Sequence, residues 1–135
     1  WYRWLPMAFS EDFAMMISLI SADGETAVGS GMVLHGGNYH LIRQVSIESD
    51  WDDNWCQTAL RATVSTDERS YEVIGDVTSL IPLRNRRTTP DGEDLLTRIT
   101  EGLTRYRCDE KIGWGLSEYL DQVIDGIPVG ADVWI

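Results

Sequence analysis

Apolar and polar residues alternate along most of the chain, and this period of two is typical of β-strands with one buried face. The alternation is clearest over 13–20, where Phe13, Met15, Ile17 and Leu19 share a face. Turn residues separate the segments in which it recurs. Those segments are 26–35, 39–47, 56–64, 71–80, 95–108 and 112–122. We expect strands there, and loops over the acidic stretch 48–53 and the basic run 84–87.

These segments predict an all-β fold of about eight consecutive strands joined by short loops. An antiparallel up-and-down meander of this length closes into a barrel or a strongly curled sheet, which removes exposed strand edges. Segment 95–108 is ambiguous, because its leucines and isoleucine also fit helical spacing, whereas its threonines, Gly102 and Tyr106 favour a strand. If 11–20 and 95–106 were helices, the chain would instead form an α+β cone of the ketosteroid-isomerase type.

Composition narrows the class of protein. The 135 residues suit a single domain over 1–135. The 22 acidic and 11 basic residues give a net charge of −11, so we expect no binding to nucleic acid. No apolar run approaches the roughly 20 residues of a membrane span, which predicts a soluble, cytoplasmic protein with no membrane span. Cys56 and Cys108 lie far apart, and we expect free thiols.

Motifs for cofactors and metals are missing from the sequence. There is no G-x-x-x-x-G-K-[ST] loop and no G-x-S-x-G elbow, and Gly113-Trp114-Gly115 lacks the third glycine of a dinucleotide fingerprint. His35 and His40 flank a glycine turn without a third ligand. We therefore expect no cofactor and no metal. His35 is either a proton shuttle at a barrel rim or a solvated turn residue.

The densest group of unusual residues is 113–119. On a strand, Glu118 shares a face with Trp114, Leu116 and Leu120. A carboxyl group among apolar and aromatic side chains would have a raised pKa and could act as a general acid. The alternative is a glutamate at the barrel mouth that pairs with an arginine.

Glu101 is a second carboxyl candidate, because it falls on the same face as Ile99 and Leu103. A charged residue on an apolar face must be paired or functional. Pairing with Arg43 or Arg105 would be ordinary, whereas a position facing a cavity would make Glu101 part of a site.

Other side chains could line a pocket or bind an anion. The candidate ligand-binding residues are Trp114, Met15, Met32, Arg43 and His35, although core packing is the default for the methionines. Three arginines within 84–87 could hold an anion or an acidic partner, or simply neutralise nearby acids.

Three stretches carry a resemblance to a known family. They are the aromatic opening 1–4, the glycine-rich strand 29–33 followed by Gly36-Gly37, and the ending 109–119 with its G-W-G-L-S-E-Y sequence. The chain resembles the lipocalin-like domains of the hydroxyneurosporene synthase (carotenoid hydratase) and AttH-like superfamily, in particular the C-terminal half of its uncharacterised bacterial double-barrel proteins. Glu110-Lys111 stand where a glycine would be expected.

This resemblance implies a lipocalin-like (calycin) barrel that is a fragment of a longer protein, with an N-terminal sister barrel or a homo-oligomer as its partner. Members bind apolar small molecules such as isoprenoids, lipids or polyketides, and the first hypothesis is that this chain does so. Some members catalyse hydration or isomerisation without a cofactor. The second hypothesis is therefore a hydratase or isomerase that uses Glu118 or Glu101 as acid, with Tyr119 or Tyr106 assisting.

Overall fold

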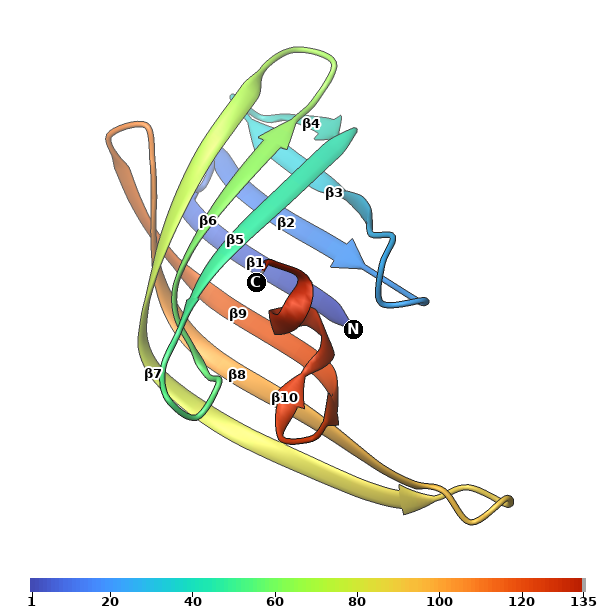
Figure 1. Cartoon of the computed structure of the whole chain (residues 1–135). Helices are drawn as coiled ribbons and strands as arrows, with labels where there is room; N and C mark the ends of the chain where they lie inside the picture. Colours follow the sequence, from blue (N-terminus) through green and yellow to red (C-terminus); the bar gives the residue numbers. More distant parts are fainter. Residues whose placement is uncertain (135) are drawn as a thin grey trace.

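A computed structural model describes residues 1–134 of the chain, and the side chains of residues 1–131 (Figure 1). The protein is all-β, with every strand antiparallel to its neighbours, as the alternation predicts. The sheet order is β4-β3-β2-β1-β9-β8-β7-β6-β5, and β10 pairs with β9. The strands are β1 (Tyr2–Ser10), β2 (Phe13–Ile20), β3 (Val28–His35), β4 (Asn38–Leu41), β5 (Gln44–Trp51), β6 (Gln57–Ser65), β7 (Ser70–Thr88), β8 (Asp94–Cys108), β9 (Lys111–Ile124) and β10 (Ile127–Pro128).

A two-residue connection forces the sheet to curl. In a flat sheet, eight gaps of about 4.8 Å would hold the edge strands β4 and β5 about 38 Å apart. Only Ile42 and Arg43 join these strands, and they can span about 11 Å. The Ile42 amide donates to the Gly31 carbonyl of β3 (3.0 Å), and the Arg43 amide donates to the Ser65 carbonyl of β6 (2.7 Å). Opposite ends of the sheet therefore meet, although no strand ladder among the described residues closes the barrel.

Four segments differ from the expected strand boundaries. The predicted third strand, 39–47, divides at Ile42-Arg43 because the chain crosses there from one sheet edge to the other. The acidic stretch expected to be a loop belongs to β5 as far as Trp51, and the basic run 84–87 belongs to β7. The aromatic opening forms β1, and together with the division of 39–47 and with β10 it brings the number of strands to ten.

The ambiguous segment is resolved in favour of a strand. Residues 94–108 form β8 between β7 and β9, and residues 13–20 form β2. The α+β cone needs helices at both places, so it is excluded. Partners on both sides satisfy the backbone groups of β8, and this outweighs the local helical spacing.

The curled sheet encloses one apolar core on its concave side. Inward positions alternate along each strand, as in β2, where Phe13, Met15 and Ile17 are buried. Core side chains from β1, β3, β6, β7, β8 and β9 meet them, and these include Leu5, Val33, Leu60, Val64, Val73, Tyr106 and Tyr119. The alternation predicted the shared buried face of Phe13, Met15 and Ile17, because one face of each strand must leave water.

A glycine lets the two ends of the sheet approach each other. A Cβ atom added to Gly29 of β3 would lie 2.6 Å from the Cβ atom of Val45 in β5. Any side chain at this position would therefore push the strands apart. The β2–β3 register runs through Gly29 and Gly31 without a shift.

The end of the chain folds back over the concave side. After a turn at Asp125-Gly126, β10 pairs with β9, and the 3-10 helix η1 (Val129–Trp134) follows. Figure 1 shows η1 in front of β1 and β9, within the curve of the sheet. Residues 1–134 form no helix with the length and apolar character that crossing a bilayer requires.

Substitution of Gly29 by valine tests whether close approach of β3 and β5 stabilises the fold. We expect Gly29→Val to lower the free energy of unfolding by about 1–3 kcal/mol, the usual cost of overpacking. Urea denaturation followed by tryptophan fluorescence measures the change. Ser30→Val is the matched control, because Ser30 is exposed on the same strand. Equal effects of the two substitutions would contradict the close-approach role.

Candidate functional site

A pocket with a volume of about 510 Å³ opens on the concave side of the sheet. It lies between β1, β2, β5 and η1, which the curl of the sheet brings together. Most of its wall is apolar, and the main apolar side chains are Trp1, Leu19, Val45, Ile47, Trp51 and Trp55. Glu25 and Glu48 lie at its edge, where both are exposed.

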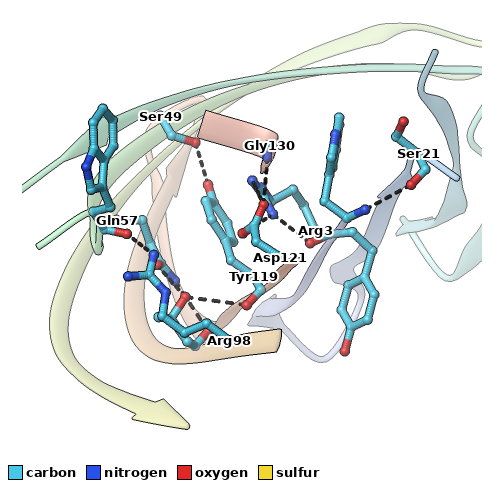
Figure 2. Close-up of polar contacts among 12 residues, drawn as sticks. Arg3, Ser21, Ser49, Gln57, Arg98, Tyr119, Asp121 and Gly130 are labelled. Carbon is cyan, nitrogen blue, oxygen red and sulfur yellow. Dashed lines mark hydrogen bonds and ion pairs between the residues drawn. The ribbon is translucent and has the colours of Figure 1, made fainter. Parts of the chain in front are cut away.

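A buried ion pair forms the polar end of the pocket. Arg3 of β1 donates from Nη1 to Asp121 Oδ2 (2.9 Å) and from Nη2 to Asp121 Oδ1 (3.1 Å). The Gly130 amide of η1 also donates to Asp121 Oδ1 (2.8 Å), as Figure 2 shows. A Cβ atom at Gly130 would lie 2.6 Å from that same oxygen, so glycine is required for the contact. Asp121 thus joins the sheet to the C-terminal segment.

Aromatic rings surround the Arg3 guanidinium. Its Cζ atom lies 4.9 Å from the Trp1 ring centre, 4.2 Å from that of Tyr119 and 5.7 Å from that of Trp51. Such cation–π contacts partly replace the water that a buried cation loses. Burial raises the pKa of Tyr119, whose hydroxyl is 2.7 Å from the Ser49 hydroxyl. Aromatic rings and the Asp121 carboxylate thus enclose the Arg3 charge and balance it at this end of the pocket.

Arg98 of β8 holds the loop that carries Trp55. Its guanidinium donates to the carbonyl groups of Asn54 (2.8 Å) and Trp55. Trp55 has a left-handed backbone (φ 57°), and its ring centre lies 6.3 Å from that of Trp51. Arg98 is thus a positioning residue for one wall of the pocket, since the two carbonyl groups fix the loop against β8.

The two carboxyl candidates lie on the convex face, away from the pocket. Glu101 and Glu118 are direct cross-strand neighbours on β8 and β9, and the Tyr2 hydroxyl donates to Glu118. Burial, followed by the neighbouring Glu118, raises the pKa of Glu101. The alternative in which Glu101 pairs with Arg43 or Arg105 is wrong. Arg43 binds Asp67 instead (3.0 Å), and no ion pair joins Glu101 to Arg105 within the described residues. The shared face of Glu118 and Trp114 was predicted correctly, but it is the outer face.

The two tyrosine candidates lie inside the sheet. Tyr106 is fully buried and donates to the Leu116 carbonyl (2.6 Å), and burial raises its pKa. Tyr119 packs under Arg3 beside the pocket. Strand alternation separates both tyrosines from Glu101 and Glu118, so the four predicted catalytic residues do not form one cluster.

None of the predicted ligand-binding residues lines the pocket. Met15 belongs to the core, whereas Trp114 and Met32 point outward and are partly exposed. Arg43 lies at the β4–β5 connection. His35 Nδ1 is 2.7 Å from the Tyr71 hydroxyl, next to Phe13 and away from the pocket.

Sequence reasoning missed the residues that build the pocket. Arg3 and Asp121 are lone charges at inward positions of apolar strands, and alternation alone could have flagged them as buried. Their pairing joins residues 118 positions apart, and only the β1–β9 register shows it. Trp51 lies within the acidic stretch 48–53, which was expected to be a loop, and Trp55 follows it, so the role of both was hidden.

The remaining candidate features are the two cysteines, the arginines within 84–87 and a metal site. Cys56 and Cys108 are free, as expected. Arg84, Arg86 and Arg87 lie exposed on the part of β7 that extends with β8 beyond the rest of the sheet (Figure 1). No group of three or more His, Cys, Asp or Glu side chains within the described residues is arranged to hold a metal ion.

One family model, described as Domain of unknown function (DUF7064), matches residues 1–123. The chain belongs to the DUF7064 family. The match covers β1 to β8 and nearly all of β9, so the DUF7064 region includes Arg3, Asp121 and the pocket tryptophans, while Gly130 and Ala131 lie beyond it. No curated protein and no solved structure matches the chain.

Breaking the buried ion pair is expected to destabilise the domain strongly. Asp121→Asn leaves the Arg3 charge buried without its counterion, which costs about 3–5 kcal/mol in comparable cases. Urea unfolding at neutral pH measures the loss. Asp67→Asn is the control, because its ion pair with Arg43 is exposed and should contribute little. Similar losses in both variants would contradict a structural role for the buried pair.

The acid pair on the convex face predicts a pH dependence. The folded state raises the pKa of Glu101, so the stabilisation by its protonated form is present below the unfolded value, about 4.3, and is lost as pH rises through the folded value. Glu101→Gln should therefore be more stable than the unmodified chain near neutral pH, and the difference should shrink at acid pH. Urea midpoints at several pH values test this, with exposed Glu72→Gln as control. A difference that does not change with pH would refute the effect.

Proposed function

We propose that this domain binds an apolar small molecule, of isoprenoid, lipid or polyketide type, in the pocket on the concave side of the sheet. The observation that carries the proposal is an apolar, tryptophan-lined pocket of about 510 Å³. Small-molecule sites are typically concave and mostly apolar, with volumes of roughly 300–1,000 Å³ and few polar groups. The size and lining of this pocket agree with that class.

The polar end of the pocket supports binding of a largely neutral ligand. Arg3 and Asp121 neutralise each other, and the carboxylate already accepts from Gly130. A charged ligand group placed there would add an uncompensated charge to a buried site, which is costly. A hydrocarbon body with at most a neutral polar group fits the site better.

A cofactor-independent hydratase or isomerase is the alternative, and the site supports it less well. Protonation of an alkene needs an acid that touches the ligand in dry surroundings. Glu101 and Glu118 lie on the other face of the sheet. Both oxygens of Asp121 are engaged, and Glu25 and Glu48 are exposed at the rim. Binding without chemistry therefore has the stronger support.

Three expectations about the relatives, the partner and the location of this domain stay predictions. They are the relation to the hydroxyneurosporene synthase superfamily, the N-terminal sister barrel or homo-oligomer, and the cytoplasmic location. Only the apolar pocket in a curled antiparallel sheet favours the relation.

Filling the pocket tests the binding proposal. N-phenyl-1-naphthylamine is a neutral apolar probe whose fluorescence rises in dry sites, and we expect it to bind and to be displaced by farnesol or retinol. Ile47→Trp places a larger side chain in the pocket wall and should weaken probe binding at least tenfold. Ile124→Trp makes the same exchange at an exposed position and should leave binding unchanged.

Two outcomes would contradict the proposal. One is that the probe does not bind to the folded chain. The other is that Ile47→Trp and Ile124→Trp bind it equally well, since the probe would then occupy another surface. Thermal unfolding of both variants shows whether they keep the fold.

A further inference from the structure

The convex face of the sheet is unusually apolar for a surface in water. Side chains of β7, β8 and β9 that point away from the core include several large hydrophobic residues. Among them are Ile81 (62% exposed), Leu83 (49%), Leu103 (45%) and Leu116 (36%). Extended exposed apolar patches on soluble proteins usually mark interaction sites.

The strand register places these residues in neighbouring rows. Leu83 lies opposite Ile99, which lies opposite Leu120. Four residues further along the strands, Leu103 lies opposite Leu116. The rows are contiguous because alternate residues of adjacent strands share one face at a spacing of about 5 Å. We call these rows, together with the row between them, the outer patch.

The middle row of the outer patch carries two carboxylates between apolar ends. It runs from Ile81 through Glu101 and Glu118 to Trp4. The Tyr2 hydroxyl donates to Glu118, but no ion pair joins either carboxylate to a basic group within the described residues. Two carboxylates directly opposite each other on adjacent strands repel. They would gain from a cation that binds both.

We propose that the outer patch is a docking surface for a protein partner whose contact surface is apolar and presents an arginine to Glu101 and Glu118. A planar guanidinium has five donors and can bridge two carboxylates, and arginine is enriched at interface centres. The apolar rows on either side would exclude water from the pair. Charge complementarity at the centre thus selects the partner, while the rows provide the buried area.

Charge also argues against two other occupants. A second copy docked face to face would bring four carboxylates together and join two chains of net charge −11. A membrane surface is disfavoured because the centre of the patch is acidic and anionic lipids would be repelled. The proposal does not depend on ligand binding, because the pocket lies on the opposite face of the sheet.

Photo-crosslinking from the outer patch tests this proposal in the cells that naturally make the protein. The photoreactive residue p-benzoylphenylalanine replaces Leu103 in the full-length protein. We expect irradiation to yield one main crosslinked segment, identified by mass spectrometry, that is apolar and contains an arginine. The same residue in place of Thr63, exposed on β6 outside the patch, should give no such product.

Charge exchange makes the test specific. Glu101→Gln with Glu118→Gln should lower the crosslink yield at least fivefold without lowering the melting temperature; if the double variant is unstable, Glu118→Gln alone replaces it. Changing the partner's arginine to glutamate should abolish the crosslink, and Glu101→Arg with Glu118→Arg should restore it. The proposal is overturned by crosslinks to a second copy, to lipid or to nothing, by a segment without arginine, by unchanged yield in the carboxamide variant, or by no restoration.

Discussion

The two-residue connection between β4 and β5 is the constraint on which the rest of the structure depends. It joins the two outermost strands of the nine-strand path, so the sheet must curl until its ends meet. Curling gives the sheet an inside and an outside. The inside contains the core, the Arg3–Asp121 pair and the pocket, while the outside contains the acid pair and the outer patch. Gly29 belongs to the same constraint, because a side chain there would keep β3 and β5 apart.

The Arg3–Asp121 pair connects three parts of the molecule in one small volume. Arg3 comes from β1, Asp121 from β9, and the Gly130 amide from the segment that follows the sheet. Buried ion pairs are weak sources of net stability but costly to break. The contribution of the Arg3–Asp121 pair is geometric, since its contact with Gly130 fixes where η1 lies over the concave side. The shape of the pocket end depends on that position.

The strands could be predicted from sequence, but the site could not. Alternation identified the buried face of 13–20, because it reports directly on which side chains avoid water. The strand character of 95–108 was predicted from its threonines, Gly102 and Tyr106 instead. On 112–122 alternation grouped Glu118 with Trp114 correctly, but this more apolar face is the outer one. The inner face carries small and polar residues beside Tyr119, so the pattern did not show which face is inside. Arg3 and Asp121 meet only through the pairing of the first and ninth strands, which depends on the whole topology.

The alternation in β9 has a consequence for how the protein tolerates change. Ser117, Tyr119 and Asp121 face the interior, whereas Leu116, Glu118 and Leu120 belong to the outer face. Neighbouring residues on this strand therefore contact different surroundings. Residues at even positions can be substituted without altering the pocket. Residues at odd positions can be substituted without altering the convex surface. The two faces of this strand can thus change independently by substitution. A one-residue insertion in β9 would instead reverse the direction of the side chains that follow it and disrupt both faces at once.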